Sequence, residues 1–153
     1  MTSAAAPTRT VEDMLTWRLA VAGRLLRCHA DARLTELRVA GPGLGLLLRL
    51  AEEDGLSQIE LARRQRVEPP TVSRMVSRLA RDGLVELRIE HADRRTTRVA
   101  LTERGREVAA AGRLIVDEIE GRVFEGLDEA DRDRLGGILD ELIAVLARRA
   151  AAQ

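Results

Sequence analysis

Four arginines in the middle of the chain have the type and spacing to bind a polyanion. Arg74 and Arg78 are four residues apart, so they share a face if their segment is a helix, and Arg94 and Arg95 are adjacent in a polar stretch. A guanidinium can donate two parallel hydrogen bonds to a phosphate or to O6 and N7 of guanine. These residues therefore suit recognition of phosphates and base edges.

Positive charge is concentrated around these arginines. All 25 basic residues are arginine, and they balance 25 acidic residues to a formal net charge of zero. From Arg63 to Arg98, however, ten arginines accompany five acids, so this segment carries +5 and the remainder −5. A positive field confined to one segment favours a single nucleic-acid-binding unit over a surface that is basic throughout.

Two short helices are predicted to carry the first pair of arginines. Ser57 and Glu60 form a capping box at the start of one helix, which runs to about Gln65. Pro69 and Pro70 suit the first turn of the next helix, where a missing N–H costs nothing. This second helix is predicted to run to about Arg81, with an inward face made of Val72, Met75, Val76 and Leu79.

A β-hairpin is predicted to follow these helices. Gly83 supplies a left-handed stop. Leu84–Arg88 and Thr97–Leu101 have the composition of short strands, and His91–Thr96 between them is polar and charged, as an exposed tip should be. Helix, turn, helix and hairpin in this order outline a winged helix whose tip bears Arg94 and Arg95.

Long amphipathic helices are predicted on both sides of this unit. The first extends from about Val11 to Arg38, roughly 40 Å at ~1.5 Å per residue, which is longer than a compact monomer needs. Gly41-Pro42-Gly43 is expected to break it before a short apolar helix at 44–53. After Thr102, a predicted N-cap, a helix runs to about residue 124, and Asp128 caps a last helix with an apolar face of Leu135, Ile138, Leu139, Leu142 and Leu146.

Two stretches of the sequence resemble the MarR family of winged-helix transcription regulators. TVSRMVSRLARDGLVE (71–86) is similar to the recognition helix and its exit, and DRRTTRVALTERG (93–105) to the wing, its second strand and the next helix cap. The resemblance extends over nearly the whole chain. It implies a mainly α fold with a small β-hairpin wing, in which helices at 11–40 and 103–149 form a dimerisation region and 42–102 form the winged helix-turn-helix, all within one domain spanning 1–153.

The resemblance also implies which residues contact DNA. Arg95 matches the arginine that enters the minor groove and Asp93 its orienting partner. Where the family often has arginine directly after the glutamate of the exit strand, this chain has Leu87, with Arg88 following. The candidate DNA-binding residues are Ser57, Gln58, Pro70, Thr71, Ser73, Arg74, Ser77, Arg78, Arg88, Asp93, Arg94, Arg95 and Arg98.

Sensing of an effector is the second function that the resemblance implies. Family ligand pockets lie between the dimer helices and the winged helix, which makes Trp17, Cys28, His29 and Arg49 candidates for a lining. Cys28, the single cysteine, continues an apolar stripe with Leu25, so we expect a buried, inert thiol. Some relatives sense peroxides through a thiolate stabilised by tyrosine hydroxyls, and this chain has no tyrosine.

Other function classes find little support in the sequence. It has no glycine-rich phosphate loop and no paired nucleophile and histidine, so no enzyme is predicted. His91 and Asp93 are two ligands on a turn and do not make a metal site, and no cofactor is expected. No segment has the length and hydropathy of a membrane span or the apolar core of a signal peptide, so a cytoplasmic location is expected.

The expected function is a dimeric, sequence-specific DNA-binding regulator, a repressor released by a small-molecule effector. Its expected partners are a pseudo-palindromic operator in double-stranded DNA, a second copy of the chain and that effector, with no membrane partner. Two alternatives remain. One is a cysteine-based oxidant-sensing repressor that uses Cys28, and the other is a winged-helix protein-interaction module without a DNA target.

Overall fold

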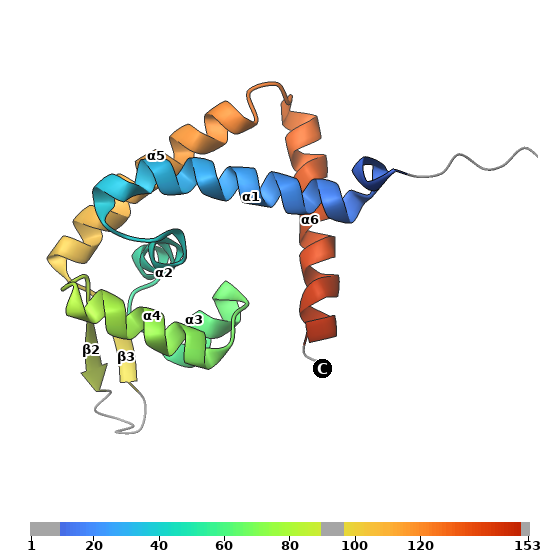
Figure 1. Cartoon of the computed structure of the whole chain (residues 1–153). Helices are drawn as coiled ribbons and strands as arrows, with labels where there is room; N and C mark the ends of the chain where they lie inside the picture. The colour runs from blue at the N-terminus through green and yellow to red at the C-terminus, as the bar shows by residue number, and fades with distance from the viewer. Residues whose placement is uncertain (1–9, 90–96, 151–153) are drawn as a thin grey trace, which may run out of the picture.

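The computed structural model describes residues 10–89 and 97–150. Within these ranges helices dominate, and a small sheet lies at one end (Figure 1). The elements follow in the order η1 (Val11–Asp13), α1 (Leu15–Leu34), η2 (Thr35–Leu37), α2 (Gly41–Glu52), β1 (Leu56–Ser57), α3 (Gln58–Gln65), α4 (Pro69–Arg81), β2 (Val85–Ile89), β3 (Thr97–Leu101), α5 (Glu103–Val123) and α6 (Glu129–Ala150).

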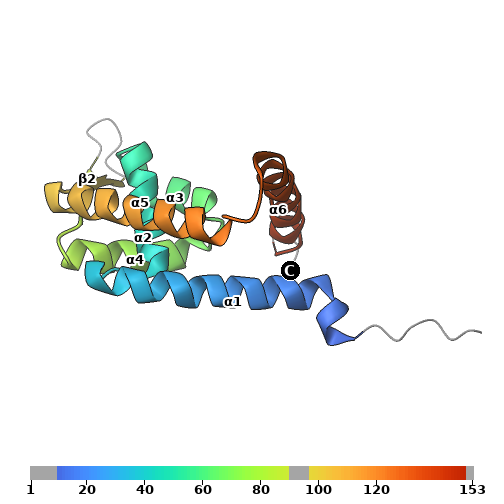
Figure 2. The same ribbon diagram turned by 90° about the horizontal axis from the view of Figure 1, so that it is seen from above.

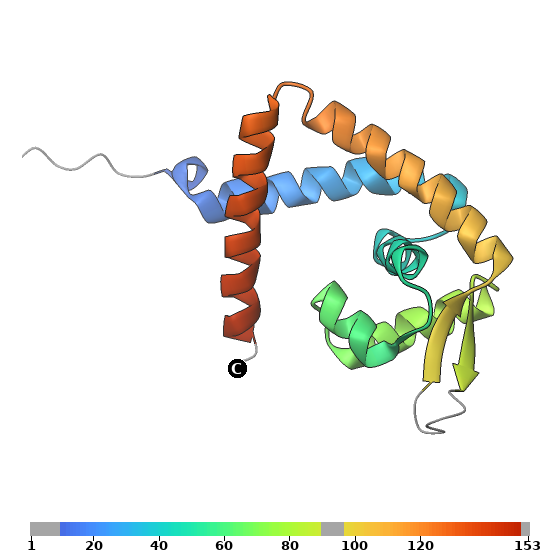
Figure 3. The same cartoon turned by 180° about the vertical axis from the view of Figure 1, so that it is seen from behind.

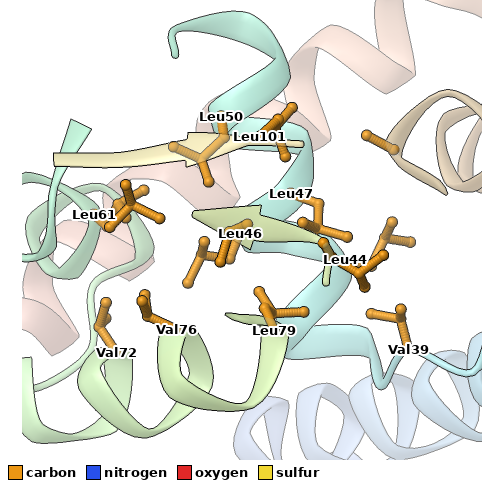
Figure 4. Packing of buried hydrophobic residues seen from close by; sticks show 14 of the residues in the cluster. Val39, Leu44, Leu46, Leu47, Leu50, Leu61, Val72, Val76, Leu79 and Leu101 are labelled. Carbon is orange, nitrogen blue, oxygen red and sulfur yellow. The ribbon is translucent and has the colours of Figure 1, made fainter. Parts of the chain in front are cut away.

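Helix α2 forms the centre of the hydrophobic core. Leu46 and Leu47 of this helix are fully buried, as are Leu61 of α3, Val72 of α4 and Val99 of β3. Figure 4 shows these elements directing leucine and valine side chains into one shared interior. Since the core has contributions from every element between α2 and β3, this segment can fix the relative positions of its own helices and strands.

The sheet has the strand order β1-β3-β2, and both pairings are antiparallel. Val85 lies opposite Leu101, and Ser57 lies opposite Arg98. The hairpin β2–β3 lies at the end of the winged helix far from α6 (Figure 3). The short strand β1 was not predicted from the sequence. It immediately precedes α3 and pairs with β3, so it places the start of α3 beside β3.

The predicted helix ends are confirmed at four places. The Ser57 hydroxyl accepts from the Glu60 amide at 3.2 Å, and Gly83 has a φ of +70°. Thr102 accepts from the Gly105 amide at 3.0 Å and Asp128 from the Asp131 amide at 2.8 Å. Each of the three N-caps satisfies a donor that the first turn of a helix leaves without an intrahelical partner, whereas Gly83 ends α4, and its N–H donates to the carbonyl of Ala80.

Three boundaries differ from the sequence prediction. The long first helix ends at Leu34, and Arg38, with a φ of 53°, closes the short turn η2 that follows it. Gly41-Pro42-Gly43 does not break a helix but begins α2, because Pro42 occupies the first turn, where its missing N–H is harmless. The predicted strand at 84–88 is shifted by one residue, to Val85–Ile89.

The last helix stands away from the body of the chain. Helices α1 and α6 cross in projection in Figure 1 but are separated in the view from above (Figure 2). At the turn that joins α5 to α6, Arg132 donates to the carbonyl oxygens of Leu127 at 3.1 Å and Phe124 at 2.7 Å. No residue of α6 is buried.

Candidate nucleic-acid interface

Helix α4 has one buried face and one polar face. Val72, Val76 and Leu79 lie in the core, and Met75 is half-buried, as the periodicity predicted. The buried face fixes the rotation of the helix about its axis. The opposite face therefore presents a defined set of exposed side chains, namely Pro70, Ser73, Arg74, Ser77 and Arg78.

Thr71 differs from the other candidates on α4 because it is half-buried. With Arg78, it lines a cavity of about 280 Å³ between α4 and the connection from α1 to α2. Arg38 lines the same cavity from the α1–α2 connection. Thr71 therefore lies at the edge of the exposed α4 face and not at its centre.

The turn between α3 and α4 adds basic side chains that the sequence analysis did not select. Arg66 ends α3 in the left-handed conformation, with a φ of 54°, and its amide donates to the carbonyl of Ala62. Arg63 and Arg66 are both exposed beside the start of α4. The run RRQR at 63–66 is the signal that could have identified them.

Ser57 and Gln58 lie at the start of α3, and both are half-buried. The Ser57 backbone N–H donates to Oε2 of Glu60 at 2.8 Å, which completes the capping box. This hydrogen bond with Ser57 and the positive charges of Arg98 and Arg64 hold the pKa of Glu60 below its ordinary value, against the opposing effect of desolvation. The Ser57 side chain thus has a structural role in addition to the predicted DNA contact.

The two strands of the wing place arginines next to carboxylates. Arg88 on β2 donates from Nε to Oε1 of Glu86 at 2.8 Å. Arg98 on β3 donates from Nη1 to Oε2 of Glu60 at 3.0 Å. The remaining wing candidates, Asp93, Arg94 and Arg95, lie outside the described residues.

A cavity of about 470 Å³ lies between the end of α2 and the first half of α5. Its apolar lining includes Leu48 and Leu101, and Arg106 and Arg113 are among its polar residues. Asp54 belongs to the same lining: its Oδ1 accepts from the Leu101 amide at 2.9 Å, and its Oδ2 lies 3.6 Å from Nη2 of Arg106. These residues were not predicted from the sequence, although Arg106 and Arg113 are seven apart and so share a face of α5.

The four effector candidates from the sequence are not part of this cavity lining. Trp17, Cys28 and His29 are exposed along α1, and Arg49 on α2 pairs with Glu52 at 3.1 Å. The expectation that Cys28 is buried is wrong for the single chain. Its stripe is apolar, but no element within residues 10–89 and 97–150 of the same chain covers it.

Two further properties concern the part of the chain that the structure describes. Over residues 10–89 and 97–150, no three His, Cys, Asp or Glu side chains are grouped so that they could hold a metal ion. No helix in these ranges is long and apolar enough to cross a membrane. His91, considered above as a metal ligand, falls outside these ranges.

The fold and the exposed face of α4 together define a winged helix-turn-helix protein. Comparison with known proteins leads to the same class. The family model described as MarR family matches residues 43–97. The helix-turn-helix transcriptional regulator BilQ of Clostridium symbiosum (strain WAL-14163) is 30% identical over 111 residues, which cover 71% of this chain and 77% of BilQ. The chain belongs to the MarR family of transcriptional regulators.

Solved structures of other proteins share the fold. CouR from Rhodococcus jostii RHA1, bound to p-coumaroyl-CoA, matches with a TM-score of 0.81 and 23% identity over 88% of this chain and 95% of CouR. MepR of S. aureus, in complex with DNA, matches with a TM-score of 0.81 and 22% identity over 90% of this chain and 99% of MepR. The MarR family to which the chain belongs consists of transcriptional regulators and not enzymes.

Proposed function

We propose that the protein is a dimeric, sequence-specific DNA-binding repressor that acts in the cytoplasm. The observation that carries this proposal is the polar face of α4. Arg74 and Arg78 are exposed one turn apart on a helix whose opposite face is locked into the core. A helix held in this way can enter the major groove with its outward residues facing base edges.

We propose different roles for different segments of the chain. Residues 42–102 bind DNA, and the helices at 11–40 and 103–149 join two copies. We assign base or phosphate contacts to Gln58 of α3, Arg88 of β2, the wing residues 93–95 and the outward side chains of α4, which are Pro70, Thr71, Ser73, Arg74, Ser77 and Arg78. Two winged helices related by a twofold axis suit a pseudo-palindromic operator with half-sites about 10 base pairs apart, or a multiple of that spacing.

The test is a binding titration on the DNA that flanks the gene, repeated over a range of salt concentrations. We expect log K to fall with log salt at a slope of roughly −0.9 for each phosphate contacted. Arg74→Ala should weaken binding by about 1–3 kcal/mol. Arg148→Ala, which changes an exposed arginine on the side of α6 away from its apolar stripe, is the matched control and should bind like wild type. A flat salt dependence would favour the protein-interaction alternative.

We also propose that an effector of the size of a small aromatic carboxylate occupies the cavity between α2 and α5. Leucine side chains could cover an aromatic body while Arg106 or Arg113 pairs with a carboxylate. That CouR was solved with p-coumaroyl-CoA, whose acyl group is aromatic, supports the aromatic part of this choice. Ala110→Trp, which fills the cavity from α5, should abolish release of the operator by such compounds without preventing operator binding.

A further inference from the structure

One oxygen atom of Glu60 connects the helix-turn-helix to the wing. Oε2 accepts the Ser57 backbone N–H at 2.8 Å and the Arg98 guanidinium at 3.0 Å. Ser57 belongs to the capping box of α3, whereas Arg98 lies on the wing strand β3. The carboxylate that begins α3 is therefore also an anchor for the wing.

The backbone around this carboxylate explains why the three groups meet. Strand β1 has two residues, and its second residue, Ser57, is paired with Arg98 of β3. Helix α3 starts at the next residue, so the first turn of the helix lies directly beside β3. The side chains of Glu60 and Arg98 are each about one-third exposed, which weakens their attraction less than full exposure to water would.

A second carboxylate holds the other end of the same strand. Oδ1 of Asp54, from the turn after α2, accepts the Leu101 amide at 2.9 Å. Strand β3 is thus attached at Arg98 and at Leu101 to residues that precede or begin α3. Since β2 pairs only with β3 in the described sheet, these two contacts act together with the buried Val99 and Leu101 to hold the direction in which the hairpin leaves the helix-turn-helix.

We propose that Glu60 and Arg98 are positioning residues, which orient the wing relative to α4 so that both reach the same stretch of DNA. This inference deepens the proposed function and rests on it. It gives Arg98 a different role from the direct DNA contact predicted from the sequence. The pair acts on DNA binding through the geometry of the hairpin and not by adding a phosphate contact.

The two roles of Arg98 predict opposite effects of Glu60→Gln. Glutamine can still serve in a capping box, so α3 keeps its start while the charge that holds Arg98 is lost. If Arg98 contacts a phosphate, removing a nearby negative charge strengthens operator binding. If Arg98 orients the wing, the same substitution weakens binding.

The experiment is a double-mutant cycle of Glu60→Gln and Arg98→Ala, measured by fluorescence anisotropy on operator DNA at several salt concentrations. We expect each single variant to bind about threefold to tenfold more weakly, the double variant to bind no worse than the weaker single variant, and the salt slope to stay at the wild-type value. Glu53→Gln is the matched control because it removes the ion pair of Glu53 with Arg64 of α3, which does not involve the wing. It should bind within about twofold of wild type.

Three results would overturn the inference: tighter binding by Glu60→Gln, additive losses in the double variant, or a slope reduced by roughly 0.9 in Arg98→Ala. A readout without DNA separates this failure from a failure of the proposed function. In hydrogen exchange, Glu60→Gln should speed exchange of the β2 and β3 amides, whereas Glu53→Gln should not. Unchanged exchange in Glu60→Gln would also reject the inference, whether or not the wild type binds an operator.

Discussion

The winged helix and the long helices use their apolar residues in opposite ways. Between α2 and β3, leucine and valine side chains such as Leu46 and Val99 are fully buried. On α1, α5 and α6, side chains of the same kind remain in contact with solvent: Leu15 is 73% exposed, Leu114 71% and Ile138 56%. Soluble monomers rarely expose apolar side chains over so many turns of helix. The first region buries most of its leucine and valine side chains within the single chain, although Ile59, Leu87 and Ile89 stay exposed. The second leaves long apolar stripes that we propose a partner covers.

This contrast supports a second copy of the chain as that partner. The turn between α5 and α6 is fixed by the Arg132 hydrogen bonds, so α6 is held away from the body by its own chain. Two copies that exchange such helices could cover each other's apolar faces around a twofold axis.

Ile138→Arg should eliminate the dimer. The side chain is exposed in the single chain, so the winged helix should keep its fold, but each dimer would bury two unpaired charges at about 3–5 kcal/mol each. Sedimentation velocity should show the loss of the dimer. Asp140→Arg is the control, because residue 140 points about 200° away from residue 138 around the helix and should leave the dimer intact. A dimer in both variants would argue against α6 as the interface.

Gly105→Ala should destabilise the winged helix by about 3 kcal/mol, because overpacking at a site closed by backbone cannot relax. A Cβ at Gly105 would lie 1.9 Å from the carbonyl oxygen of Leu84. At Gly121 on the same helix, nothing lies within 4 Å, so Gly121→Ala should raise stability by up to about 1 kcal/mol in the absence of a partner contact. Urea unfolding measures both changes. If Gly105→Ala leaves the free energy of unfolding unchanged, α5 does not approach the Leu84 backbone as closely as the structure shows.

The pH dependence of stability should show the contribution of Glu60. Its pKa is lower in the folded chain than the ordinary value of 4.5, so folding favours the carboxylate. The resulting stability is fully present above about pH 4.5, the pKa expected for the unfolded chain, and is lost as pH falls through the folded pKa. Urea midpoints measured from pH 6 downward should therefore fall less steeply in Glu60→Gln than in wild type. Equal slopes would mean that folding does not favour the charged form of the Glu60 carboxyl.

The smallest effect is expected for Cys28→Ser. Cys28 is exposed in the single chain, yet the chain has no tyrosine, and His29 points about 100° away around α1. We expect the serine variant to bind the operator like wild type and peroxide to leave the wild-type complex intact. Release by peroxide that Cys28→Ser resists would make the oxidant-sensing alternative the better account.

Local sequence signals predicted much of the winged helix. The burial of α4, the cap at Ser57 and the stop at Gly83 depend on residues within a few positions of one another, so periodicity and capping rules suffice. The contacts of Glu60 with Arg98 and of Asp54 with Leu101 join residues far apart in sequence, and β1 is too short to give a strand pattern. Periodicity also identified the stripe of Cys28 as apolar but could not tell whether the same chain or another one covers it.

The most direct test of the account is the mass of the protein–DNA complex, measured by analytical ultracentrifugation with a duplex from the flanking DNA at saturating protein. We expect two chains on each operator, with Ile138→Arg failing to form this complex. One chain per duplex bound with wild-type affinity, or no operator complex at low salt, would contradict it.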